Sequence, residues 1–168
     1  TGNSTAGYFG GGAYPERATM DKVTYSTDTT AVVPGAALSA ARYALAATGN
    51  STAGYFGGGF ILSSPYEVST MDKVTYSSDT TAAVPGANLT VARRGPAATG
   101  SPEAGYFGGG FASPHFTTVD KVTYASDTTA AVPGANLSVA RDRLAATGNS
   151  EAGYFGGGPG PRSTMDKV

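Results

Sequence analysis

The sequence of 168 residues contains no cysteine, no tryptophan and a single histidine, His115. Without cysteine, neither disulfide bonds nor thiolate metal sites can form. This composition fits either a reducing compartment or a β-rich protein that is stabilised by packing alone.

Charge is also scarce, because charged residues make up 14% of the chain and the net charge is −1. No basic field is available to hold a nucleic-acid backbone or an anionic membrane. No apolar run approaches the length of a membrane span, and no charged-then-apolar segment resembles a signal peptide. We therefore expect neither a nucleic-acid partner nor insertion into a membrane.

Glycine is abundant, with 25 residues, and it marks an internal repeat. The segment Tyr-Phe-Gly-Gly-Gly begins at four positions, Tyr8, Tyr55, Tyr106 and Tyr154. A second conserved block follows the first three of these segments, at residues 19–42, 70–93 and 118–141. Such agreement indicates that each unit occupies nearly the same environment.

Each period of about 48 residues is typical of four short strands separated by turns. In the second unit, the strands are predicted at residues 42–49, 53–59, 70–77 and 80–86. The first is rich in alanine, and the third alternates as a strand with one buried face should. Pro85 has no backbone N–H to donate to a neighbouring strand, which suits a strand at the outer edge of a sheet. Residues 87–93 are the only segment that could form a helical turn.

Four antiparallel strands repeated every 40 to 50 residues favour an all-β fold of radial propeller blades, in which small alanines crowd the central axis. A β-solenoid is the alternative, but its period is usually shorter. We expect a single repeat domain over residues 1–168, with a partial blade at 1–41, blades at 42–92 and 93–140, and a partial blade at 141–168.

About three blades and a partial one are too few to close a ring. Two interpretations are open. Either the sequence is a window from a longer chain, or copies of the chain associate with one another to complete a propeller ring.

Three segments of the second unit carry a family resemblance: Tyr55-Phe56-Gly57-Gly58, Val74-Thr75-Tyr76, and Pro85 followed by Arg93. They resemble, in this order, the glycine doublet that ends the second strand, the third strand and the closing segment of the kelch repeat. The tryptophan that kelch blades usually carry on the fourth strand is replaced by Ala-Ala-Val, so the sequence is kelch-like. The glycine-rich sequence of the repeat also resembles repeats in virion-associated proteins of marine bacteriophages, and this resemblance implies a virion or extracellular location.

The repeated polar residues favour structural roles. Asp28, Asp79 and Asp127 stand in hairpins, where we expect each to bond its own backbone in an Asx-type turn. Asp72 and its equivalents Asp21, Asp120 and Asp166 each precede a lysine, which indicates pairing between blades or at the surface rather than a calcium site. The fork of Arg42, Arg93 or Arg141 could bond the carbonyl groups of a neighbouring blade or a carboxylate such as Asp72.

Catalysis is not expected, because active sites normally break a repeat and nearly all carboxylates here are repeated. The kelch-fold enzymes with a copper-radical centre need Cys, Tyr and more than one His, which this sequence does not supply. We predict no catalytic residue, no metal site and no cofactor.

The repeat varies most between the triple glycine and the third strand. These loops differ in length and carry aromatic and basic residues, and a constant scaffold with changing loops is typical of a binding surface. Neutral drift in tolerant loops is the alternative. Connections between blades should emerge on the same side. The predicted binding residues are Tyr14, Arg17, Phe60, Tyr66, Phe111, His115, Phe116 and Arg162.

The sequence therefore favours a non-enzymatic structural or adhesive module, associated with a virion as in a tail fibre, that binds a protein or glycan surface through these loops. An intracellular kelch-type adaptor for protein partners and a carbohydrate-active enzyme domain are the alternatives.

Overall fold

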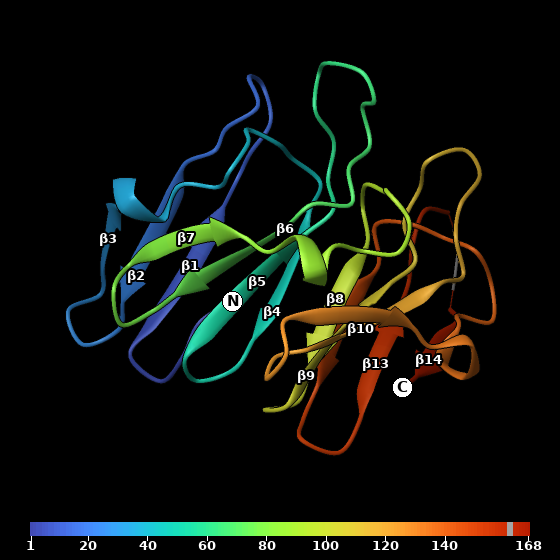
Figure 1. Cartoon of the computed structure of the whole chain (residues 1–168). Coiled ribbons are helices and arrows are strands. Elements are labelled where there is room, and N and C mark those ends of the chain that lie inside the picture. The colour runs from blue at the N-terminus through green and yellow to red at the C-terminus, as the bar shows by residue number, and fades with distance from the viewer. Residues whose placement is uncertain (161–162) are drawn as a thin grey trace.

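The computed structural model describes residues 1–160 and 163–168, which form four antiparallel sheets that follow one another along the chain (Figure 1). The first sheet contains β1 (Ala6–Gly10), β2 (Met20–Thr24) and β3 (Thr29–Val32). The second contains β4 (Ala46–Gly49), β5 (Ala53–Gly57), β6 (Met71–Thr75) and β7 (Thr80–Ala83). The third contains β8 (Ala97–Gly100), β9 (Ala104–Gly108), β10 (Val119–Thr123) and β11 (Thr128–Ala131). The last contains β12 (Ala145–Gly148), β13 (Gly153–Gly156) and β14 (Met165–Lys167).

Each sheet is a meander whose strands pair in chain order, and the register repeats from one sheet to the next. Tyr8 lies opposite Lys22, and Tyr55 lies opposite Lys73 in the same way. Three short 3-10 turns follow the outer strands, at η1 (Pro34–Ala36), η2 (Pro85–Ala87) and η3 (Pro133–Ala135). The repeated sequence therefore produces repeated geometry.

The sheets lie closest at their inner strands. Strand β8 contacts both β4 and β12, whereas β7 and β11 contact the 3-10 turn of the preceding sheet. At this outer edge, the Thr81 hydroxyl donates to the carbonyl of Ala36 at 2.6 Å, and Thr129 bonds Ala87 in the same way. Such packing is that of blades, so the predicted all-β propeller segment is confirmed at the level of its sheets.

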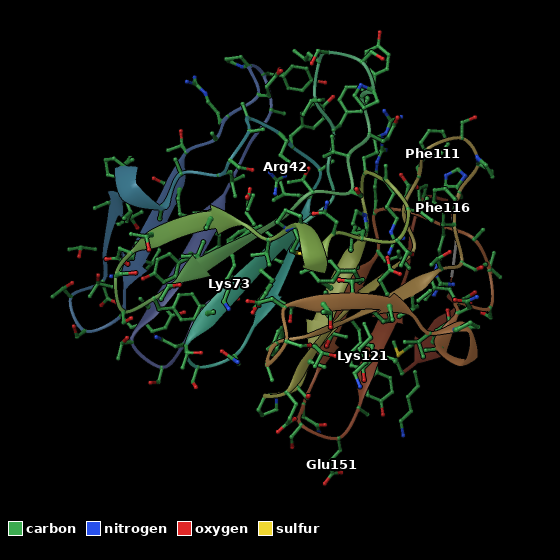
Figure 2. All side chains as sticks on the ribbon, viewed as in Figure 1. Arg42, Lys73, Phe111, Phe116, Lys121 and Glu151 are labelled. Atoms are coloured by element: carbon green, nitrogen blue, oxygen red, sulfur yellow. The ribbon has the colours of Figure 1, made fainter. Side chains whose placement is uncertain are left out.

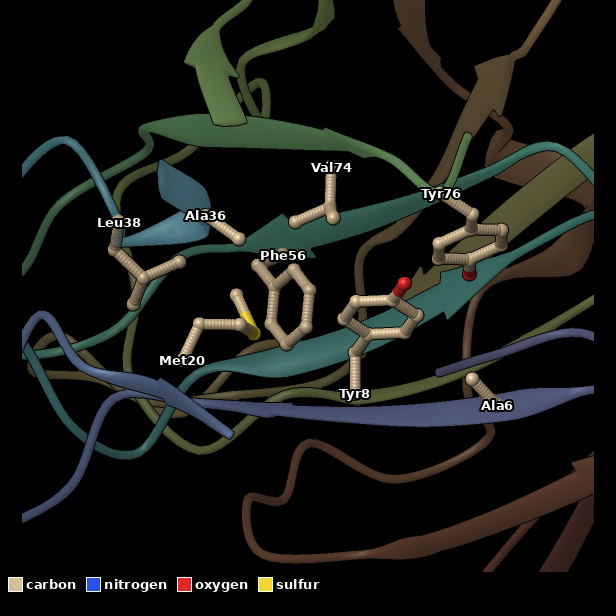
Figure 3. Close-up of a cluster of buried hydrophobic side chains, with 8 residues drawn as sticks. All are labelled: Ala6, Tyr8, Met20, Ala36, Leu38, Phe56, Val74 and Tyr76. Atoms are coloured by element: carbon tan, nitrogen blue, oxygen red, sulfur yellow. The ribbon is translucent and has the colours of Figure 1, made fainter. Parts of the chain in front are cut away.

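The core lies between the sheets (Figure 3). Tyr8 and Met20 of the first sheet pack against Phe56, Val74 and Tyr76 of the second. An equivalent cluster joins the second and third sheets. A third cluster, which includes Val119 and Phe155, joins the third and last sheets. Each sheet thus contributes apolar surface to its neighbours, which is the main source of stability in repeat proteins.

Two features of the strands differ from the prediction. The third strand was predicted to bury one face, but Met71 and Val74 point to opposite faces and both are fully buried, because a central blade is covered on each side. The first strand begins at Ala46 and excludes Ala44, which is exposed and has a φ of 54°.

The helical turn also lies earlier than the sequence indicated. It spans Pro85–Ala87 instead of lying within residues 87–93, because the fixed φ of proline favours the start of such a turn. No helix within residues 1–160 and 163–168 is long and apolar enough to cross a membrane.

Candidate functional site

The loops that vary between repeats emerge on one side of the molecule, which we call the loop face. It comprises the β1–β2, β5–β6 and β9–β10 loops and the connections from each 3-10 turn to the next inner strand, near the top of Figure 1. The glycines after the second strand bring these segments together. Gly58 has a φ of 70°, and a Cβ atom there would lie 2.6 Å from the carbonyl oxygen of Arg93. Only glycine permits this approach.

A buried ion pair anchors each connection. Arg42 donates to Asp72 Oδ2 at 2.8 Å and to the carbonyl of Phe56 at 3.1 Å, and both charged side chains are fully buried. Arg93 pairs with Asp120 in the same way, and Arg141 pairs with Asp166. The prediction that the arginine fork binds a carboxylate such as Asp72 is confirmed. The carbonyl group was expected to come from a neighbouring blade, but Phe56 lies on β5 of the same blade, because Arg42 leads into β4 and β4 pairs with β5.

Burial and the ion pair have opposite effects on the pKa of Arg93. Desolvation lowers the pKa of Arg93, and the nearby charge of Asp120 opposes that shift. A charged group in such a place is stable only while its partner remains. The anchors therefore fix the backbone directly beneath the loop face.

Aromatic and charged side chains form a continuous row across the loop face. The ring centroids lie 6.3 Å apart for Tyr14 and Tyr43, and 5.3 Å apart for Tyr43 and Phe60. The guanidinium carbon of Arg94 lies 4.9 Å from the ring of Phe60 and 4.9 Å from that of Phe111. The ring of His115 lies 4.8 Å from Phe111 and ends the row. We call this set the aromatic row: Tyr14, Tyr43, Phe60, Arg94, Phe111 and His115.

The structure brings five of the predicted binding residues together. Tyr14, Phe60, Phe111 and His115 belong to the aromatic row, and Tyr66 stacks on Phe60 at 5.8 Å.

The remaining three predicted residues stand apart from this arrangement. Arg17 and Phe116 lie on the same loops, as Figure 2 shows for Phe116, but no ring contact joins either to the row within the described part of the chain. Arg162 lies outside the described residues.

Sequence reasoning missed Tyr43 and Arg94, which connect the loops to one another. Both directly follow the repeated arginine, and Asp142 holds the same position in the next unit. The change from Tyr to Arg to Asp directly after the constant block was the available signal. The row therefore draws on two variable segments of each unit.

A hollow of about 230 Å³ lies beside the row, lined by Tyr14, Tyr43, Ala44, Arg94, Gly95, Asp142 and Arg143. Ionisable side chains surround it. Arg94 Nη1 lies 3.3 Å from Glu67 Oε1. Asp142 Oδ1 lies 3.3 Å from His115 Nε2, and Asp142 Oδ2 lies 3.5 Å from Arg143 Nε. The site thus offers aromatic faces together with hydrogen-bond donors and acceptors.

The hairpin aspartates do not act as predicted. Asp79 has a φ of 52°, and its carboxylate binds the preceding sheet, where Lys22 lies 2.8 Å from Oδ2 and Tyr8 donates to Oδ1. Lys73 and Tyr55 bind Asp127 in the same way. The expected Asx-type turn is therefore wrong for Asp79 and Asp127, and the lysines bind these residues instead of the aspartates that they follow.

The contacts of Asp79 shift its pKa. Burial alone would raise the pKa of Asp79, but the hydrogen bonds from Lys22 and Tyr8 outweigh it, so the pKa lies below its ordinary value. Burial raises the pKa of Tyr76 to about 12. Both shifts belong to contacts between sheets, away from the loop face.

No group of three or more potential His, Asp or Glu ligands is close enough to hold a metal ion within residues 1–160 and 163–168. Comparison with models of known protein families finds no match, and a search of curated proteins finds no significant relative.

Proposed function

We propose that the chain is a non-enzymatic adhesive module, of the kind carried on virion tail fibres, that binds a receptor glycan through its loop face. The aromatic row is the single observation that supports this proposal most strongly. It joins residues from three successive units. The sequence varies between units at each of these positions, whereas the strands of the sheets stay nearly constant. The resemblance to repeats of bacteriophage virion proteins supports the location.

The chemistry of the row suits a sugar chain. Sugar rings carry apolar C–H faces that pack on aromatic side chains, and their hydroxyl groups need fixed polar partners. Tyr14 is 95% exposed, so its ring is accessible, and Arg94, Asp142 and Arg143 line the neighbouring hollow. One sugar unit would occupy the hollow, and further units would follow the row toward Phe111.

Binding of the purified chain to a glycan array tests the proposal, followed by calorimetric titration with the strongest glycan. The variants Tyr14→Ala and Arg94→Ala should each weaken binding at least tenfold, because each removes part of the row. Val32→Ala is the matched control, since Val32 is 57% exposed on the outer strand β3. It should leave the affinity unchanged.

Three outcomes would contradict the proposal. The array could show no binding, the two row variants could bind as well as the control, or the bound glycan could be cleaved. Binding of a protein without any glycan would favour the adaptor alternative.

A further inference from the structure

The contacts between successive sheets follow one pattern. Phe56 of the second sheet lies over Gly10 of the first, with its Cε1 atom 3.1 Å from the place where a Cβ on Gly10 would stand. Phe107 lies over Gly57 in the same way, with its Cε1 atom 2.9 Å from the place of a Cβ on Gly57, and Phe155 lies over Gly108. A phenylalanine from one sheet therefore packs on a glycine of the sheet before it, in the space that a side chain there would fill. We call this space the seat of that glycine.

Polar contacts surround each seat. Tyr8 stacks on Tyr76 with ring centroids 4.8 Å apart, and Tyr55 stacks on Tyr124 at the same distance. At the rim, Lys73 pairs with Asp127 at 2.8 Å. The hydroxyl groups of Thr48 and Tyr124 lie 3.3 Å apart. Apolar and charged contacts thus define one interface, which is repeated between units.

The two outermost sheets expose opposite halves of this interface. On the first sheet, Phe9 is 64% exposed and Tyr25 is 49% exposed, and Asp28 is also exposed. Their equivalents in the third sheet are Phe107, which is fully buried, Tyr124, which is 7% exposed, and Asp127. We call Phe9, Val23, Tyr25 and Asp28 the first end face.

On the last sheet, Met165 is 67% exposed, whereas its equivalent Met71 is fully buried. We call Thr147, Tyr154, Gly156, Met165 and Lys167 the last end face. A largely apolar hollow of about 480 Å³ lies over it. Within the described part of the chain, a Cβ on Gly156 would meet only the Met165 side chain, at 3.4 Å, so its seat holds no phenylalanine.

We propose that the first end face of a second copy of this chain docks on the last end face. Phe9 of the second copy occupies the seat on Gly156, and its Tyr25 stacks on Tyr154. Asp28 accepts hydrogen bonds from Tyr154 and Lys167, as Asp79 does from Tyr8 and Lys22. The proposal is independent of the glycan proposal, because it uses none of the loop face.

Charge and shape both favour this occupant. Asp28 and Lys167 are exposed and opposite in sign, and they hold the positions that pair within the chain. Apolar residues as exposed as Phe9 and Met165 also favour burial on association. Because the two faces differ, the contact is head to tail, and it forms either a closed ring or an open series of copies.

Sedimentation velocity over a range of concentrations tests the proposal with three variants. Phe9→Glu blocks the first end face, and Gly156→Glu blocks the last end face. Ala82→Glu, on the exposed outer strand β7, adds the same charge elsewhere. We expect the parent chain and Ala82→Glu to associate, and Phe9→Glu and Gly156→Glu each to weaken association at least tenfold.

A mixture of the two blocked variants gives the sharpest result. Each retains the face that the other has lost, so an equimolar mixture should form a dimer with one intact interface. Circular dichroism of each variant shows whether it is folded. A parent chain that stays monomeric at about 100 μM, a concentration at which even weak complexes form, would overturn the proposal. A mixture of folded variants that stays monomeric would overturn it too.

Discussion

Removal of one buried arginine should strongly destabilise the chain. In Arg93→Met, Asp120 stays fully buried but loses its charged partner at 2.9 Å. Breaking a buried ion pair in this way typically costs about 3–5 kcal/mol in the free energy of unfolding. The backbone and side chain of Thr90 still donate two hydrogen bonds to Asp120, so we expect a loss near the lower end, about 3 kcal/mol.

Lys73→Met is the matched control, because it also replaces a cation that pairs with an aspartate. The side chains of Lys73 and Asp127 are 28% and 34% exposed, and solvent-screened pairs of this kind contribute about 0.2–1 kcal/mol. Urea unfolding followed by tyrosine fluorescence measures both variants, since the chain has ten tyrosines and no tryptophan. Equal losses for the two variants, or a loss below about 1 kcal/mol for Arg93→Met, would refute this reasoning.

Two further predictions concern pH and the glycine turns. Because the pKa of Asp79 is lowered in the folded chain, its stabilising contribution is complete above the ordinary value of 3.8 and is lost as the pH falls through the lowered pKa. Asp79→Asn should therefore flatten the fall of the urea midpoint on acidification, and an unchanged pH profile would contradict this account. Gly58→Ala should lower the free energy of unfolding by at least about 2 kcal/mol, since it adds an unfavourable φ of 70° to a close contact with the Arg93 carbonyl. Gly134→Ala should be nearly neutral in the same urea titration, because no described atom lies within 4 Å of the added Cβ, and equal effects of the two changes would disprove the explanation.

The repeat made the sheets predictable from the sequence. Strand alternation, the glycines after Phe56 and the proline at position 85 were enough to place the four strands of a unit to within a few residues. The pairing of Arg42 with Asp72 was one of two possibilities that the sequence left open, because the repeat offers a carboxylate in each unit but does not show which group lies nearest.

Contacts between units were harder to predict. Lys22 and Asp79 are 57 residues apart and meet only because successive sheets pack face to face. Packing of successive sheets also buries both faces of the third strand. The alternation of residues along a strand does not show what covers each face. Tyr43 and Arg94 were missed because their role depends on neighbours from two different units.

The central claim is that packing of the sheets places variable residues of successive units in one row. Nuclear Overhauser measurements on the chain in solution test it most directly. The structure predicts cross-peaks between the rings of Tyr43 and Phe60, and from the Arg94 side chain to both Phe60 and Phe111. A folded chain that shows none of these cross-peaks would contradict the account.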